Sequence, residues 1–152
     1  MAENAEKLIP GRQGAWVLSL AGVLPFLALC IASFLAGKTA ALFPFYVDAF
    51  KTWSVAILCF LGGIRWGMAI LAKPVSPKLL FLSTLSAFAG WIALFLSDAA
   101  GVMLLLLAYS AQGAWDSFSI HGGEGPQWFA DLRIVLTLMV AATHIVMLVA
   151  VF

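Results

Sequence analysis

Residues 53–72, WSVAILCFLGGIRWGMAILA, decide the fold of this chain. The stretch is almost continuously apolar, and it has the length that an α-helix needs to cross the hydrocarbon core of a bilayer, about 20 residues. Arg65 is its one charged residue. Because a helix that is hydrophobic all round has no face for water, the stretch predicts a transmembrane helix.

The composition of the whole chain agrees with this prediction. Of the 152 residues, 64% are hydrophobic and 10% are charged, and the mean hydropathy is +1.07. Soluble domains carry roughly 25% charged residues, so this chain has too few to cover a surface in water. The net charge of +1 provides no basic face, and we expect no nucleic-acid partner. The predicted fold class is all-α: one integral membrane bundle, residues 1–152, of about five transmembrane helices.

The predicted spans follow from the apolar stretches along the chain. They cover residues 15–36, 53–72, 79–97, 100–115 and 134–152. Pro25 predicts a kink in the first span. That span is longer than the apolar core of a signal peptide, so we expect it to be retained. Two longer connections, 37–52 and 116–133, have room for short helices at the membrane interface.

The distribution of lysine and arginine predicts the orientation. With five spans, the side of the membrane that holds the N-terminus carries Lys7, Arg12, Lys73, Lys78 and Arg133. The other side carries only Lys38 and Lys51. Because basic residues concentrate on the cytoplasmic side, we expect the N-terminus inside and the C-terminus outside.

Arg65 is the most informative polar residue, because it lies within a span. An arginine there costs at least about 2.5 kcal/mol, so it has to face protein or water and contact an acceptor. In the predicted topology the acidic residues of the last loop, Asp116, Glu124 and Asp131, lie on the same side. We expect Asp131 or Glu124 to pair with Arg65. Two interpretations stay open: a structural ion pair, or the binding of an anion or a lipid head group.

The helix that contains Arg65 also carries a GxxxG pair, Gly63 and Gly67. Gly62 and Trp66 share its side. Small residues let the backbone of another helix approach closely. Arg65 projects from the opposite side, so both sides of this helix need protein neighbours. We expect it to be central in the bundle or to contact another subunit.

His144 lies in the last predicted span, near the middle of the bilayer. Arg133, Thr137 and His144 follow one another at helical spacings, so they form a polar stripe on one side of that helix. An ionisable residue inside a membrane suggests a function, such as a proton relay, a quinone contact or a haem ligand. The alternative is a neutral histidine bonded to a serine or threonine of a neighbouring helix. A bis-histidine haem site has no second intramembrane ligand, because His121 lies in a loop.

Three stretches together resemble a known family: LAGVLPFLAL (20–29), FLGGIRWGMAI (60–70) and PQWFADLRIVLT (126–137). They are similar to the small multispan inner-membrane proteins typified by transmembrane protein sixty-nine, a domain of unknown function. The resemblance implies an inner membrane, bacterial here or mitochondrial in eukaryotic relatives, and it transfers no catalytic residue. By their place in the motifs, the residues of interest are Pro25, Gly62, Gly63, Arg65, Trp66, Gly67, Trp128 and Arg133.

Two functions of different classes follow. The first is a non-enzymatic accessory, assembly or stabilising subunit of energy-transducing membrane complexes, because the chain has no catalytic constellation and little length outside the membrane. The second is a binder or carrier of a lipid-like, quinone or tetrapyrrole ligand that uses Arg65 and the last loop. We expect no enzyme activity, no cofactor and no metal, since His121 and Glu124 alone are too few ligands. The expected partners are the bilayer and other membrane subunits or further copies of the chain.

Overall fold

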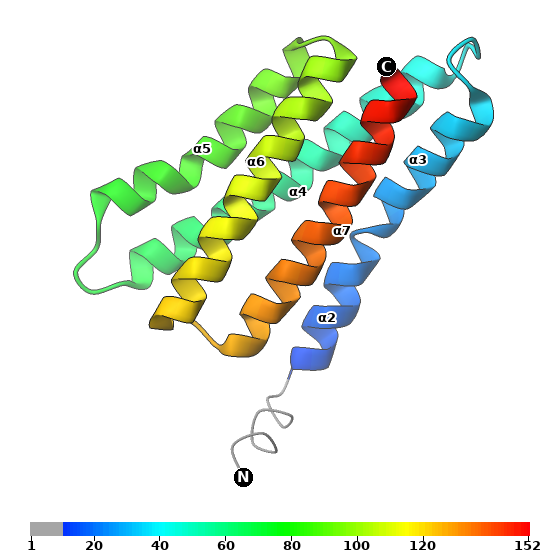
Figure 1. Ribbon diagram of the computed structural model, residues 1–152. Helices are drawn as coiled ribbons and strands as arrows, with labels where there is room; N and C mark the ends of the chain where they lie inside the picture. Colours follow the sequence, from blue (N-terminus) through cyan, green and yellow to red (C-terminus); the bar gives the residue numbers. More distant parts are fainter. Residues whose placement is uncertain (1–10) are drawn as a thin grey trace.

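The computed structural model describes residues 11–152, except for the side chain of Glu124. Every regular element in this range is helical, which confirms the predicted all-α class, and the helices run back and forth between two ends of one bundle (Figure 1). We call the end where α2 begins the N-side end, and the end that holds the C-terminus the C-side end. The elements are α2 (Arg12–Ala21), α3 (Leu24–Ala36), α4 (Phe43–Leu71), α5 (Pro77–Phe95), α6 (Asp98–Ser119), the π-helical turn η1 (Ile120–Glu124) and α7 (Gln127–Val151).

The first predicted span consists of two helices, α2 and α3, separated by a turn at Gly22 and Val23. Pro25 stands in the first turn of α3, where a backbone N–H would have no helical partner in any case. Proline therefore fits at the start of α3, but it prevents α2 from continuing into α3 as one regular helix. At this break, Trp53 Nε1 of α4 donates a hydrogen bond to the carbonyl oxygen of Gly22 at 3.1 Å. The kink expected at Pro25 is confirmed.

The helix α4 begins at Phe43, so most of the connection predicted over 37–52, which had room for a short separate helix, instead belongs to the second span. The reason is Lys51, which suggests a loop but is 4% exposed inside the helix. Its Nζ lies 3.2 Å from Asp98 Oδ1 and donates to the carbonyl oxygen of Leu96 at 3.3 Å. Leu96 lies in the connection between α5 and α6, and Asp98 is the first residue of α6. A lysine paired in this way does not have to leave the helix.

The loop predicted over 116–133 is also wrong, because α6 continues past residue 116 and α7 begins before residue 133. Asp116 and Arg133 lie in these two helices and form an ion pair, so neither charge has to reach water. The chain reverses in a short connection instead. There Gly123 has a φ of 99°, a left-handed conformation that glycine adopts without strain.

Five helical segments cross the bundle. Four are long and apolar enough to span a membrane by length and composition: α2 with α3, α4, α5 and α7. The fifth, α6, has 22 residues, or about 33 Å of helix, which also suffices. It is less apolar because it carries Gln112 and Asp116, and both side chains are buried in the bundle.

Polar side chains gather inside the bundle and large apolar ones outside. The buried polar residues are Ser33, Lys51, Ser54, Arg65, Ser83, Ser86, Gln112, Asp116, Arg133, Thr143 and His144. Leu35, Leu71 and Phe95 are among the exposed apolar residues, at 83%, 80% and 73%. Water-soluble proteins rarely expose contiguous apolar surface on this scale, so the solvent around these helices is lipid. The chain is a multi-pass membrane protein.

The helix α4 is central, as predicted: it contacts α3, α5 and α6, and Figure 1 shows it crossing behind α6 and α7. The glycine that lets a neighbour approach is Gly62, where a Cβ would lie 2.7 Å from the backbone oxygen of Ser83 in α5. At Gly63 and Gly67 a Cβ would meet no atom of a neighbouring element within 4 Å. The expected GxxxG pair therefore packs no helix of the described chain.

Candidate functional site

Two arginines share one carboxylate near the N-side end of the bundle. Arg133 of α7 places Nε and Nη2 each 2.7 Å from Asp116 Oδ2 of α6. Arg65 of α4 places its Nε 3.5 Å from Asp116 Oδ1. All three side chains are at most 6% exposed. A buried charge is costly without a partner, and the carboxylate of Asp116 is the partner that allows the Arg133 guanidinium to be buried inside the bundle. We call these three residues the Arg–Asp cluster.

Further polar side chains hold the carboxylate of the cluster in place. Gln112 Nε2 donates a hydrogen bond to Asp116 Oδ1 at 3.1 Å. Ser86 Oγ of α5 donates in turn to Gln112 Oε1 at 2.5 Å. The chain of hydrogen bonds therefore reaches from α5 through α6 to α7, and the buried carboxylate has donors on both of its oxygens.

The guanidinium of Arg65 lies against the last turns of α6. Its Nη2 donates to Ser119 Oγ at 2.7 Å, and its carbon Cζ lies 4.3 Å from the centre of the Trp115 ring. A cation above an aromatic face is attracted by the negative charge of the π system. Among the described side chains, Arg65 thus contacts Asp116, Ser119 and Trp115.

The predicted pairing of Arg65 with Asp131 is wrong. Asp131 is exposed in the first turns of α7, whereas Arg65 is buried and faces α6. The prediction placed residue 116 in a loop, and the continuation of α6 brings the carboxylate of Asp116 to the arginine instead. The side chain of Glu124, the other predicted partner, lies outside the described residues.

His144 lies in an aromatic enclosure at the middle of the bundle, and no part of it is exposed. Its Nε2 lies 3.2 Å from Ser54 Oγ of α4, and its Nδ1 lies 2.8 Å from the carbonyl oxygen of Val140. Three rings surround the imidazole, with centroid distances of 4.8, 5.2 and 5.6 Å: Phe50, Tyr109 and Phe26. The contact with a serine of a neighbouring helix is the one expected of a structural histidine, and a ligand has no access to it.

The polar stripe predicted along α7 is divided between different environments. Arg133 contacts Asp116, and His144 lies among the aromatic rings. Thr137 packs on α6 at Gly113, where a Cβ would overlap the threonine hydroxyl. Of the three stripe residues, Arg133 and Thr137 line a common cavity and His144 does not.

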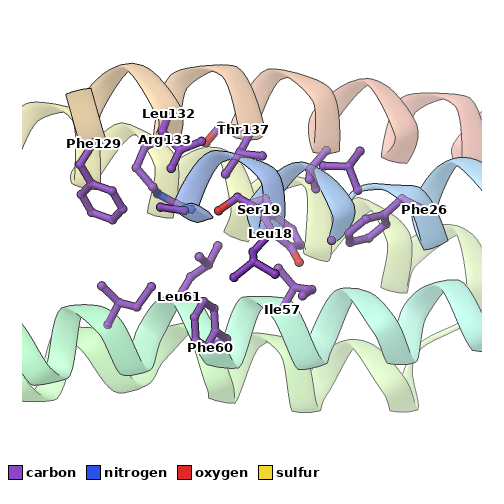
Figure 2. A pocket seen from close by; sticks show the side chains of 17 residues that line it. Leu18, Ser19, Phe26, Ile57, Phe60, Leu61, Phe129, Leu132, Arg133 and Thr137 are labelled. Carbon is purple, nitrogen blue, oxygen red and sulfur yellow. The ribbon is translucent and has the colours of Figure 1, made fainter. Parts of the chain in front are cut away.

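This cavity, with a volume of about 390 Å³, lies between α2, α4 and α7. Figure 2 shows Phe129 at one end and Phe26 at the other, with Arg133, Thr137 and Ser19 between them. Most of the other lining side chains are leucine, isoleucine, valine or phenylalanine. Ligand sites are typically apolar with a few polar groups, and this volume lies within their range of roughly 300–1,000 Å³.

The mouth of the cavity opens sideways into the bilayer. Leu18 and Phe60 belong to its lining and are 76% and 64% exposed, although both lie well within their spans. Because α2 rests on α7 while α3 packs on α4, the wall between α2 and α4 is left incomplete. The opening between α2 and α4 therefore lies on the apolar side of the bundle.

The sequence places Asp116 on the same side as Arg65 but does not single it out as the common partner of Arg65 and Arg133. It gives no indication of the cavity. A signal for Asp116 was present, because Gln112 and Asp116 stand four residues apart in an otherwise apolar segment, which places both on one inward face of a helix. The cavity has no comparable signal, since it depends on the angle at which α2 leaves α3.

Comparison with known proteins places the chain in a family. The family described as "Protein of unknown function (DUF3429)" matches residues 11–149. Over 130 residues the chain is 32% identical to transmembrane protein 69 of Xenopus tropicalis, covering 82% of this chain and 49% of that protein. Over 145 residues it is 28% identical to transmembrane protein 69 of Mus musculus, covering 93% and 58%. The chain thus spans about half the length of these curated relatives, and no solved structure matches it. The chain belongs to the DUF3429 family, as the sequence motifs implied.

Proposed function

We propose that this member of the DUF3429 family is a non-enzymatic membrane protein that binds a lipid-like amphiphile between α2, α4 and α7. The observation that carries the proposal is the cavity: an apolar space of about 390 Å³ with a mouth toward lipid and a buried arginine in its wall. This is the second of the two functions expected from the sequence. Arg133 takes the place of Arg65 as the residue that faces the ligand.

Among the ligand classes expected from the sequence, the cavity favours a slender amphiphile over a tetrapyrrole. Haem and related groups are held by axial protein ligands such as histidine. His144 is fully enclosed by protein, and His121 is exposed at the turn after α6. Neither histidine lines the cavity, whereas apolar side chains line it over most of its length.

The proposal is tested by asking what the purified protein retains. The full chain is extracted in a mild detergent, and bound lipids are identified by native mass spectrometry. Ser19→Phe fills the cavity from α2, and Leu20→Phe is the matched control, since Leu20 does not line the cavity. We expect the wild type and Leu20→Phe to retain an amphiphile that Ser19→Phe loses. Equal retention in all three proteins, or none in the wild type, would refute the proposal.

A second candidate is the accessory subunit, and one observation favours it. Gly63 and Gly67 form an open strip on the surface of α4, beside the exposed side chain of Trp66. In membranes such small-residue strips let a second helix approach closely. The proposed partner is a transmembrane helix of another subunit. Reproducible co-purifying subunits that Gly63→Leu removes would support this function, and a wild-type protein without them would exclude it.

We further propose that the chain resides in a bacterial inner membrane with its N-side end toward the cytoplasm. The basic residues of the N-side end include Arg12, Lys73 and Lys78, whereas the loop before α4 at the C-side end carries Lys38. An excess of basic residues marks the cytoplasmic side. An alkaline phosphatase fusion after Phe152 is expected to be active, and an active cytoplasmic reporter at that position would reverse the orientation.

A further inference from the structure

We infer that the amphiphile carries an anionic head group, a carboxylate or a phosphate, and that Arg133 binds it. The inference rests on the proposed function, since it specifies the ligand of the same cavity. It is carried by three observations: the hydrogen bonds of Arg133, the distribution of polar groups along the cavity and the absence of an acidic side chain from its described lining.

The guanidinium of Arg133 has a donor that the protein does not use. Its Nε and Nη2 contact Asp116, and no hydrogen bond in the described part of the chain involves Nη1. Within that part, the one fully buried side-chain nitrogen or oxygen atom without a partner is Nε1 of Trp128. Nη1 is therefore not enclosed by protein. Because Arg133 lines the cavity and is otherwise 4% exposed, its free donor is accessible from the cavity.

The cluster also fixes the orientation of this donor. Asp116 holds one edge of the Arg133 guanidinium through two contacts of 2.7 Å, and Gln112 donates to the other oxygen of the same carboxylate. A planar guanidinium held along one edge presents its remaining N–H groups in a fixed direction. This is the arrangement of a binding group that is already positioned before its ligand arrives.

The polar side chains of the cavity include Arg133, Ser19 and Thr137, which lie between Phe129 and Phe26, and the part around Arg133 suits the head group of an amphiphile (Figure 2). Arg133 lies six residues into α7, or about 9 Å from the N-side end of the helix, close to the level of lipid head groups. The hydroxyl-bearing residues Ser19 and Thr137 lie near it, and Phe26 marks the deeper end (Figure 2). A head group at Arg133 would therefore extend its chain toward the middle of the bilayer.

The charge of the cavity selects the head group. Among the described residues that line it, Arg133 is the only charged one. The carboxylate of Asp116 does not serve Arg133 alone, because Arg65 Nε lies 3.5 Å from its other oxygen. A hydrogen bond from a guanidinium to an anionic oxygen is stronger than one to a neutral oxygen, and low polarity increases the difference. An anion is therefore preferred over an alcohol of the same length.

The preference is measured by titrating the full-length protein in detergent with three amphiphiles of one chain length. Palmitate supplies a carboxylate, palmitoyl lysophosphatidate a phosphate and hexadecanol a neutral hydroxyl. Native mass spectrometry gives the bound fraction of each. We expect both anions to bind the wild type about tenfold more tightly than hexadecanol, which is the magnitude of one charge-assisted hydrogen bond.

Two variants test whether Arg133 is responsible. Arg133→Gln should bring the affinity for both anions down to that for hexadecanol, while hexadecanol binding stays the same. Because this change also removes a partner of Asp116, Ser19→Glu provides a test that leaves the cluster intact. It places a carboxylate inside the cavity and should remove the preference for anions. Gln13→Glu makes the same change on α2 at an exposed position outside the cavity and should preserve it.

The possible results separate the inference from the proposed function. If the wild type binds none of the three amphiphiles, the proposed function is wrong. If it binds all three equally, or if Ser19→Glu keeps the preference, the cavity binds amphiphiles and the role of Arg133 is wrong. If acetate or inorganic phosphate displaces palmitate at a comparable concentration, the site takes free anions, and the acyl chain has no part in recognition.

Discussion

The two halves of α4 each carry a basic residue inside the bundle, and the protein accommodates them differently. Lys51, in the half toward the C-side end, pairs with Asp98, whose side chain is 45% exposed at the start of α6. Arg65, in the half toward the N-side end, contacts Asp116, whose side chain is 6% exposed and which Arg133 also contacts. The first pair reaches the surface of the molecule, and the second is enclosed.

This difference separates a structural contact from a candidate binding group. The Lys51 ammonium also donates to the carbonyl oxygen of Leu96, and the pair joins α4 to the connection between α5 and α6. The Arg–Asp cluster joins three helices, but it also leaves a donor of Arg133 accessible from a cavity. Apolar side chains would pack the same space at lower cost than three buried charges. Head-group binding, as proposed, gives a reason for the charges that helix packing does not.

The largest effect is expected from Asp116→Asn, which removes the carboxylate of the enclosed cluster. Loss of one partner of a buried ion pair typically costs about 3–5 kcal/mol, because the remaining charge stays buried. We expect a loss of this size in the free energy of unfolding, measured by titration with SDS in mixed micelles. Asp131→Asn is the control on α7, where the side chain is exposed, and should change the value by less than about 0.5 kcal/mol. Equal effects of the two changes would show that the cluster does not stabilise the fold.

The next largest effect is expected at Gly62, where α4 packs against α5 three residues before Arg65. Gly62→Ala places a Cβ at 2.7 Å from the Ser83 backbone oxygen, so α4 and α5 have to separate. Overpacking of this kind costs about 1–3 kcal/mol. Gly63→Ala, one residue further on, meets no neighbouring atom within 4 Å and is expected to be neutral or slightly stabilising. The same unfolding titration compares the two, and a larger loss for Gly63→Ala would mean that this face is packed by another helix.

A smaller effect is expected at the other half of α4. Asp98→Asn weakens the pair with Lys51, but the carboxylate is 45% exposed, so little of its charge is buried in the folded state. Lys51 is buried, but it keeps the carbonyl oxygen of Leu96 as an acceptor, and the charge that is removed is the exposed one of the pair. Ion pairs at the surface contribute up to about 1 kcal/mol, and the negative charge at a helix N-terminus adds a similar amount at most. We expect a loss of about 1 kcal/mol, clearly below that of Asp116→Asn. A loss as large as that of Asp116→Asn would remove the distinction between the two halves.

The sequence predicts the parts of this fold that depend on local signals. Apolar stretches of sufficient length locate the spans, and Pro25 locates the break between α2 and α3. The sequence predicts loops at Lys51 and Asp116, because a charge fits within a span only when a partner on a neighbouring helix faces it. The sequence does not show which helices are neighbours. Arg65 and Arg133 stand out in the sequence as candidate site residues, because a charged residue in an apolar span needs a partner. That both contact Asp116 depends on helix packing, which the sequence does not show. The cavity depends on the relative direction of α2 and α4, which no motif records.

The smallest expected effect is the salt dependence of the stability losses caused by Asp98→Asn and Asp116→Asn. It tests whether the two halves of α4 differ in their access to solvent. Salt screens exposed charges, with a Debye length that falls from about 10 Å at 0.1 M to about 3 Å at 1 M, and it screens enclosed charges much less. The difference in unfolding free energy between the wild type and Asp98→Asn should therefore shrink to a few tenths of a kcal/mol at 1 M NaCl. The difference between the wild type and Asp116→Asn should stay the same within error. If both differences shrink together, solvent reaches Asp116 as it reaches Asp98, and the donor of Arg133 faces water rather than a cavity that selects an amphiphile.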